Sequence, residues 1–175
     1  ASLGLVVDHL KVDYKGIFDA RGLFKTIAAW AFERDMEKIE TKSHEHELEN
    51  GKSIDYETYY SKRMTDYTIF VFKIKILASG LNKVDIVQGK KHVKMDQGKV
   101  LIHLDSFVQS DSEHKWDNTP FLVFLRTIFD KYIYKSYTER FEHHVTKLTH
   151  ELYAVINKFL NIHEHPKLVK DVPKF

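Results

Sequence analysis

Alternation of apolar and polar residues in the middle of the chain predicts a series of β-strands. Phe70 and Phe72 fall on one face of a strand, and Lys73 and Lys75 fall on the other. Residues 99–110 alternate in the same way. One buried face and one solvated face are typical of an antiparallel sheet. We therefore predict strands at about residues 5–17, 36–48, 53–63, 66–78, 82–95 and 99–110.

Glycines punctuate these strands where hairpin turns would fall. Asn50-Gly51 is the strongest turn signal, because a type I′ turn needs positive φ at both central residues. Ser79-Gly80 and Gln97-Gly98 give weaker signals of the same kind, and Gly89 interrupts the strand at 82–95. The spacing predicts an antiparallel meander.

Helical spacing replaces alternation at two places. Asp19 is the expected N-cap of a helix that ends near Arg34. Asn118-Thr119-Pro120 begins a second helix that continues to residue 161. A continuous helix of that length spans about 60 Å, so we expect either a kink near Lys135-Ser136 or packing of the second half on another chain. The apolar positions of the first helix are Leu23, Phe24, Ile27, Trp30 and Ala31, and those of the second are Phe121, Leu125, Ile128, Tyr132, Phe141, Val145, Leu148, Leu152, Val155 and Phe159.

The fold class that follows is α+β. A curved antiparallel sheet of about six strands carries a short helix after the first strand and a long C-terminal helix packed on the sheet. Residues 1–162 form one domain, and 163–175 form a loose tail. This order of elements resembles the helix-grip arrangement of the START-like (polyketide cyclase and Bet v 1-like) superfamily. The resemblance implies a cavity between sheet and helix for a hydrophobic or amphipathic ligand, and it implies no catalytic residue.

Composition narrows the classes of protein that remain. The 175 residues are 43% hydrophobic, include no cysteine and carry a formal charge of +2. The lack of cysteine excludes disulfides and thiolate chemistry, and the balanced charge argues against a nucleic-acid partner. No apolar run approaches the roughly 18 residues of a membrane span. No secretory signal is visible, so we expect a cytoplasmic protein.

Two histidines of the hairpin at 36–63 raise the question of a metal site. If Asn50-Gly51 is a two-residue turn, His46 and His44 lie opposite Asp55 and Glu57 on one face. Two imidazoles and two carboxylates could hold zinc or manganese. Lys42 lies on the same face, and a neighbouring cation disfavours a metal. We therefore interpret this face as solvent-exposed and predict no metal or other cofactor.

The opposite face of the same hairpin has the composition of a binding wall, since it mixes isoleucines with hydroxyls and one carboxylate. Glu45 is expected opposite Tyr56, where a desolvated carboxylate would have a raised pKa. A half-covered end of the sheet is the alternative interpretation of this face. The predicted ligand-binding residues are Ile39, Thr41, Ser43, Glu45, Tyr56, Thr58, Tyr60 and Phe72.

These features predict a binding module for a small hydrophobic or amphipathic molecule held between sheet and C-terminal helix. The alternative is a structural protein that forms a homo-oligomer through that helix. A third hypothesis is a hydrolase or cyclase-like enzyme that uses Glu45 with nearby tyrosines, or a metal at His44 and His46. No residue is assigned a catalytic role.

Overall fold

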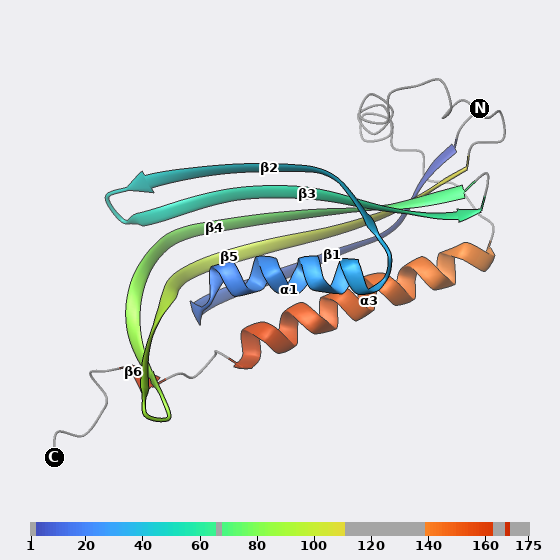
Figure 1. Cartoon of the computed structure of the whole chain (residues 1–175). Coiled ribbons are helices and arrows are strands. Elements are labelled where there is room, and N and C mark those ends of the chain that lie inside the picture. Colours follow the sequence, from blue (N-terminus) through green and yellow to red (C-terminus); the bar gives the residue numbers. More distant parts are fainter. Residues whose placement is uncertain (1–2, 66–67, 111–138, 163–166, 169–175) are drawn as a thin grey trace, which may run out of the picture.

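Six strands of the described chain form one antiparallel sheet with two helices on one of its faces (Figure 1). The structure is a computed structural model, and it describes residues 3–65, 68–110, 139–162 and 167–168. The order across the sheet is β1-β5-β4-β3-β2, and β6 pairs with β4. The elements are β1 (Leu3–Phe18), α1 (Ala20–Glu33), β2 (Glu37–Leu48), β3 (Gly51–Thr65), β4 (Thr68–Gln88), β5 (Lys91–Ser110), α3 (Glu139–Ile162) and β6 (Lys167–Leu168).

The predicted α+β class is confirmed. One helix follows the first strand, and a C-terminal helix packs on the antiparallel sheet, an arrangement compatible with helix-grip topology. The sheet curves so that β4 and β5 bend past the ends of α1 and α3 (Figure 1). Among the described residues, no helix combines the length and apolar character needed to cross a membrane.

The long β4–β5 hairpin differs from the prediction, which broke it at Ser79-Gly80 and at Gln97-Gly98. Both strands continue through these positions, and the chain turns only at Gly89-Lys90. The register shifts between Ser79 and Asn82, which marks a β-bulge. Bulges bend a strand and increase its twist. The glycines therefore mark the bend of the sheet, and the predicted turns were wrong.

Contacts with the end of β5 position the start of α1. The helix follows Asp19 as predicted, but no side-chain cap bond is formed by Asp19. Instead, the Ala20 amide donates to Asp96 Oδ2 at 3.1 Å, and Asp96 also pairs with Lys83 at 2.9 Å. At the other end, Asp35 adopts a φ of 54°, which redirects the chain into β2. Helix α1 is thus fixed to the sheet at its first turn.

The main hydrophobic core lies between the helices and the inner face of the sheet, the face that carries Phe70 and Phe72. The predicted positions of α1 are buried, except that Phe24 is only partly buried. In α3, Ile156 and Leu160 are fully buried, whereas the predicted Val155 and Phe159 are partly buried. The side chains of α3 that are buried in this layer are Val145, Leu148, Leu152, Ile156 and Leu160.

The second half of the predicted C-terminal helix is present as α3. Residues 120–138, with the expected kink near Lys135-Ser136, lie outside the described residues. Within the segment predicted as a loose tail, Lys167–Leu168 pairs with β4 at Val87 and Ile86. The rest of that segment also lies outside the described residues.

Candidate functional site

Aromatic side chains fill much of the layer between α1 and the sheet. Trp30 of α1 meets Phe72 of β4 edge-on, with ring centroids 5.9 Å apart. Phe70 meets Phe72 in the same manner at 5.3 Å. Further along α1, Phe24 packs against Tyr56 of β3 at 4.6 Å. Phe72, which the sequence predicted as a ligand contact, is fully buried at the centre of this group.

Two buried polar atoms beside Phe72 have no hydrogen-bond partner within the part of the chain that the structure describes. They are Nε1 of Trp30 and Oγ of Ser106. Trp30 is 4% exposed and Ser106 is 0% exposed. Ser106 lies directly opposite Phe72 in the β4–β5 pairing, so both side chains point to the inner face. Phe72 thus packs against the ring that carries one of these atoms and pairs across strands with the residue that carries the other. We call the two atoms the orphan groups.

Neither group was predicted as functional. Trp30 was assigned to the core because its spacing is helical, and periodicity does not reveal whether an indole N–H finds a partner. Ser106 did leave a signal in the sequence. It interrupts the apolar series Ile102, Leu104, Val108 at a position where the strand's buried face demands an apolar residue.

The predicted binding wall divides into a buried part and an open part. Thr58 and Tyr60 are buried, Tyr56 and Ile39 are partly buried, and Thr41 is exposed. Thr41 and Thr58 share a hydrogen bond of 3.2 Å between their hydroxyls. The remaining wall residues of β2, Ser43 and Glu45, are exposed. The β2 end of the inner face is therefore open, and the β3 and β4 side chains lie deeper.

The register of the β2–β3 hairpin differs from the prediction by two residues. Leu48 pairs with Gly51, so the turn is Glu49-Asn50. Glu45 consequently lies opposite Ile54 and not opposite Tyr56. A shift of two preserves the face of the side chains between Glu40 and Tyr59, because strand side chains alternate with period two. Beyond Glu40 a bulge changes the pairing, so that Lys38 lies opposite Tyr60.

Glu45 does not have the desolvated environment that the sequence suggested. Its side chain is 53% exposed and forms an ion pair of 2.7 Å with Lys52. Tyr60 is the wall residue with the shifted titration: burial raises its pKa, the neighbouring Tyr56 raises it further, and a hydrogen bond with Thr58 partly offsets this. Tyr60 therefore stays protonated at neutral pH and can serve as a hydrogen-bond donor.

Arg34 joins the two helices next to Trp30. Its guanidinium lies 4.5 Å from the centre of the Trp30 ring and donates to the Trp30 carbonyl oxygen at 3.2 Å. It also pairs with Glu151 of α3 at 3.4 Å and with Glu33 at 3.8 Å. The indole is therefore held between Phe72 on the sheet side and a neutralised arginine on the helix side.

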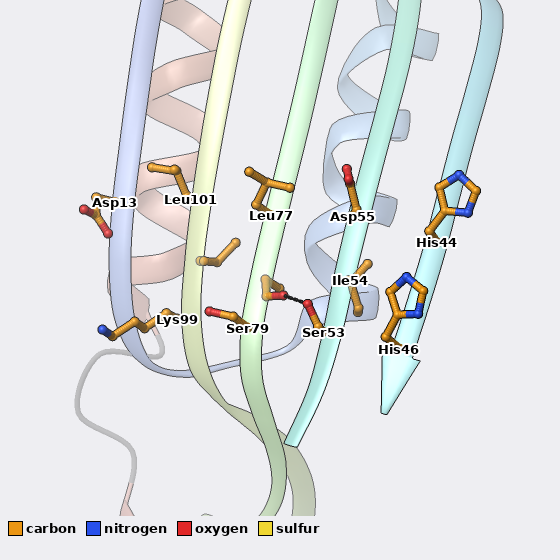
Figure 2. A pocket seen from close by; sticks show the side chains of 12 residues that line it. Asp13, His44, His46, Ser53, Ile54, Asp55, Leu77, Ser79, Lys99 and Leu101 are labelled. Atoms are coloured by element: carbon orange, nitrogen blue, oxygen red, sulfur yellow. Dashed lines mark hydrogen bonds between the residues drawn. The ribbon is translucent and has the colours of Figure 1, made fainter. Parts of the chain in front are cut away.

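The outer face of the sheet, opposite the helices, carries a shallow hollow of about 530 Å³ (Figure 2). Leu77 and Leu101 form its apolar floor. His44 and His46 line it from β2, with Asp55 of β3 beside them. His44 lies opposite Asp55, whereas His46 lies opposite Ser53 because of the changed register. The two histidines are exposed, as the solvent-facing interpretation expects.

Glu57, the fourth candidate metal donor, makes contacts with other side chains. It lies opposite Lys42, accepts a hydrogen bond from the Tyr59 hydroxyl at 2.7 Å and pairs with Lys73 at 3.1 Å. Burial alone would raise its pKa, but these contacts and the charge of Lys75 lower it below its ordinary value. Among the described residues, no three histidine or carboxylate side chains gather in a metal-binding arrangement.

A second polar cluster lies further along the outer face. His9 contacts Asp105, and the His9 and His103 rings stack with centroids 5.7 Å apart. Burial lowers the pKa of His103, as do the charges of His9, Lys11 and Lys75, against the opposing effect of Asp105. The cluster lies on the outer face of the sheet, where His9 is 60% exposed and Asp105 is 20% exposed.

Comparison with known proteins adds no functional assignment. No model of a known protein family and no curated protein matches this chain. The function must therefore be inferred from the two orphan groups and their surroundings.

Proposed function

We propose that this protein binds a small amphipathic molecule in the layer between the sheet and the helices, as a member of the helix-grip superfamily. The observation that carries the proposal is the pair of buried orphan groups, Trp30 Nε1 and Ser106 Oγ, in residues that both neighbour Phe72. The proposal places the polar end of the ligand at these groups and its apolar body among the surrounding aromatic side chains.

An unsatisfied buried donor is unfavourable, because it lost its hydrogen bonds to water on folding. The cost is about 1–3 kcal/mol for each group, and native proteins leave few such groups without a partner. Two such groups next to one ring favour a bound molecule that supplies their missing hydrogen bonds. A ligand with a polar end supplies it, and its apolar body gains by leaving water.

The surroundings of Phe72 suit binding better than catalysis. The polar side chains there are an indole and hydroxyls, among them Thr58 and Tyr60. Such groups donate and accept hydrogen bonds but do not exchange protons readily near neutral pH. The open β2 end of the inner face, at Thr41 and Ser43, offers the route by which a ligand reaches the interior. We therefore propose no catalytic role and no resident cofactor.

Nile red, an uncharged dye with a carbonyl acceptor, provides the direct test. We expect its fluorescence to rise and shift to the blue with folded protein, at one dye per chain. Trp30→Phe and Ser106→Ala should weaken the binding, whereas Ser53→Ala on the outer face should not. Native mass spectrometry of the purified protein should show a carried small molecule. A folded protein that leaves Nile red unchanged would refute the proposal.

Two further parts of the interpretation stay predictions. The cytoplasmic location is compatible with the absence of cysteine from the sequence. Assembly through the C-terminal helix is the alternative function, and light scattering tests it: a homo-oligomer that dissociates when α3 is altered would favour it over ligand binding.

A further inference from the structure

The chemistry of the two orphan groups restricts what the polar end of the ligand can be. We infer that it is an uncharged oxygen acceptor, as in an alcohol, ketone or ester, and not a carboxylate or an amine. This inference rests on the proposed function and specifies its ligand class. It follows from the donor character of Trp30 and from the charges near it.

The indole N–H of Trp30 can only donate a hydrogen bond. An aliphatic amine is protonated near neutral pH, and its ammonium group has donors but no lone pair, so it leaves the indole N–H unsatisfied. An oxygen with a free lone pair satisfies it. The Ser106 hydroxyl adapts to either role by rotation, so it accepts from an alcohol or donates to an ester. Both orphan groups are therefore satisfied by one class of oxygen.

Charge decides between neutral and ionised oxygen. A carboxylate buried beside Phe72 would need a cation, since an unpaired charge in an apolar layer is far more costly than an unpaired dipole. Arg34 is the cation that touches Trp30, and Glu151 and Glu33 already pair with it. The buried groups that adjoin Phe72 on the sheet are Phe70, Ser106 and Tyr60. Lys62, which lies opposite Phe70, donates from its ammonium group to the Arg34 carbonyl oxygen at 2.9 Å. Arg34 and Lys62 thus both already have partners, and the layer offers a dipole and hydroxyls to the ligand.

Four compounds with the same apolar chain test this inference: decane, decanol, methyl decanoate and decanoate. Each competes with Nile red for the intact protein near neutral pH, where decanoate is ionised. We expect decanol and methyl decanoate to bind about tenfold more tightly than decane, the factor that corresponds to one net hydrogen bond. Decanoate should bind most weakly.

The variants assign this preference to the orphan groups. Trp30→Phe keeps a ring against Phe72 but removes the indole donor, so the affinity for methyl decanoate should fall toward that of decane while the affinity for decane itself changes little. Ser53→Ala, which removes a hydroxyl on the outer face, should leave the whole order unchanged. Circular dichroism would show that each variant is folded.

The possible outcomes separate the inference from the proposed function. Tightest binding by decanoate, or equal binding by decane and methyl decanoate, would overturn the inference and leave a ligand-binding protein. A preference for the ester that survives both Trp30→Phe and Ser106→Ala would also overturn it. Failure of Nile red and all four compounds to bind folded protein would refute the proposed function, and the inference with it.

Discussion

Substitution of Gly98 by alanine should destabilise the protein, because the bend of the sheet has no room for a side chain there. An added Cβ would lie 2.8 Å from the Ser79 carbonyl oxygen, 3.0 Å from that of Gly80 and 2.9 Å from Cδ2 of Leu81. The leucine can move, but the two oxygens belong to the bulge that bends β4. Overpacking of this kind costs about 1–3 kcal/mol.

Alanine also restricts the unfolded chain, which raises the free energy of unfolding by about 0.4–1 kcal/mol. The expected net loss is therefore about 1–2 kcal/mol in the free energy of unfolding, or a fall in Tm of about 3–6 °C for a domain of this size. Urea and thermal unfolding followed by circular dichroism measure both quantities. If the bend is as crowded as these distances indicate, the loss appears as a lower urea midpoint with an unchanged slope.

Gly89→Asn provides the matched control. Gly89 lies at the hairpin turn with a positive φ of 62°, but no atom lies within 4 Å of its added Cβ, and asparagine tolerates this left-handed conformation. We expect it to leave stability nearly unchanged. A Gly98→Ala protein as stable as the wild type would show that the bulge is not tightly packed, and would refute the steric account of the bend.

The remaining predictions concern buried polar groups, a surface ion pair and the core. Ser106→Ala should leave the ligand-free protein as stable as the wild type or more stable by about 1 kcal/mol, because it removes an orphan; Thr58→Val, which removes a buried and bonded hydroxyl, should lower stability in the same urea titration. Loss of stability in both variants would show that Ser106 has a partner in the free protein. The lowered pKa of Glu57 contributes stability above about pH 4.5 that disappears as pH falls through the lower, folded-state pKa. Glu57→Gln should therefore lose less stability than the wild type between about pH 6 and pH 3, and parallel loss would contradict the shift. Leu152→Ala, at a fully buried position of α3, should cost about 2–5 kcal/mol by thermal unfolding; a much smaller loss would mean that α3 packs loosely on the sheet.

Periodicity correctly predicted the strands and the helix in which the apolar residues follow one regular spacing. Alternation located the inner face of β4 and β5, and helical spacing located α1 to within one residue of its observed ends. The turns were harder to predict, because glycine occurs both in hairpin turns and in β-bulges. Gly98 avoids a clash with the carbonyl oxygens of another strand, and such a contact depends on pairing that local sequence does not encode.

The candidate site shows a similar division. From Glu40 to Leu48 the face of each β2 residue was predicted correctly, whereas the register was wrong by two, because Asn50 and Gly51 do not together form the turn. The bulge between Lys38 and Glu40, which places Lys38 opposite Tyr60, was not predicted. Sequence also could not distinguish the buried β3 side of the wall from its exposed β2 side, since that depends on how far α1 reaches across the sheet. The orphan state of Trp30 is likewise a tertiary property.

The pairing of β1 with β5 has a consequence for the order in which the newly made chain folds. Leu3 pairs with Ser110, whereas the β2–β3 and β4–β5 partners are joined by tight turns. As the chain leaves the ribosome, the hairpins can close soon after they emerge, but the first strand must wait for the fifth. Closure over such a long segment is slow, and the waiting strand exposes apolar residues such as Val12. Translation pauses or chaperones that act before β5 appears should therefore influence the yield of this protein more than those that act later.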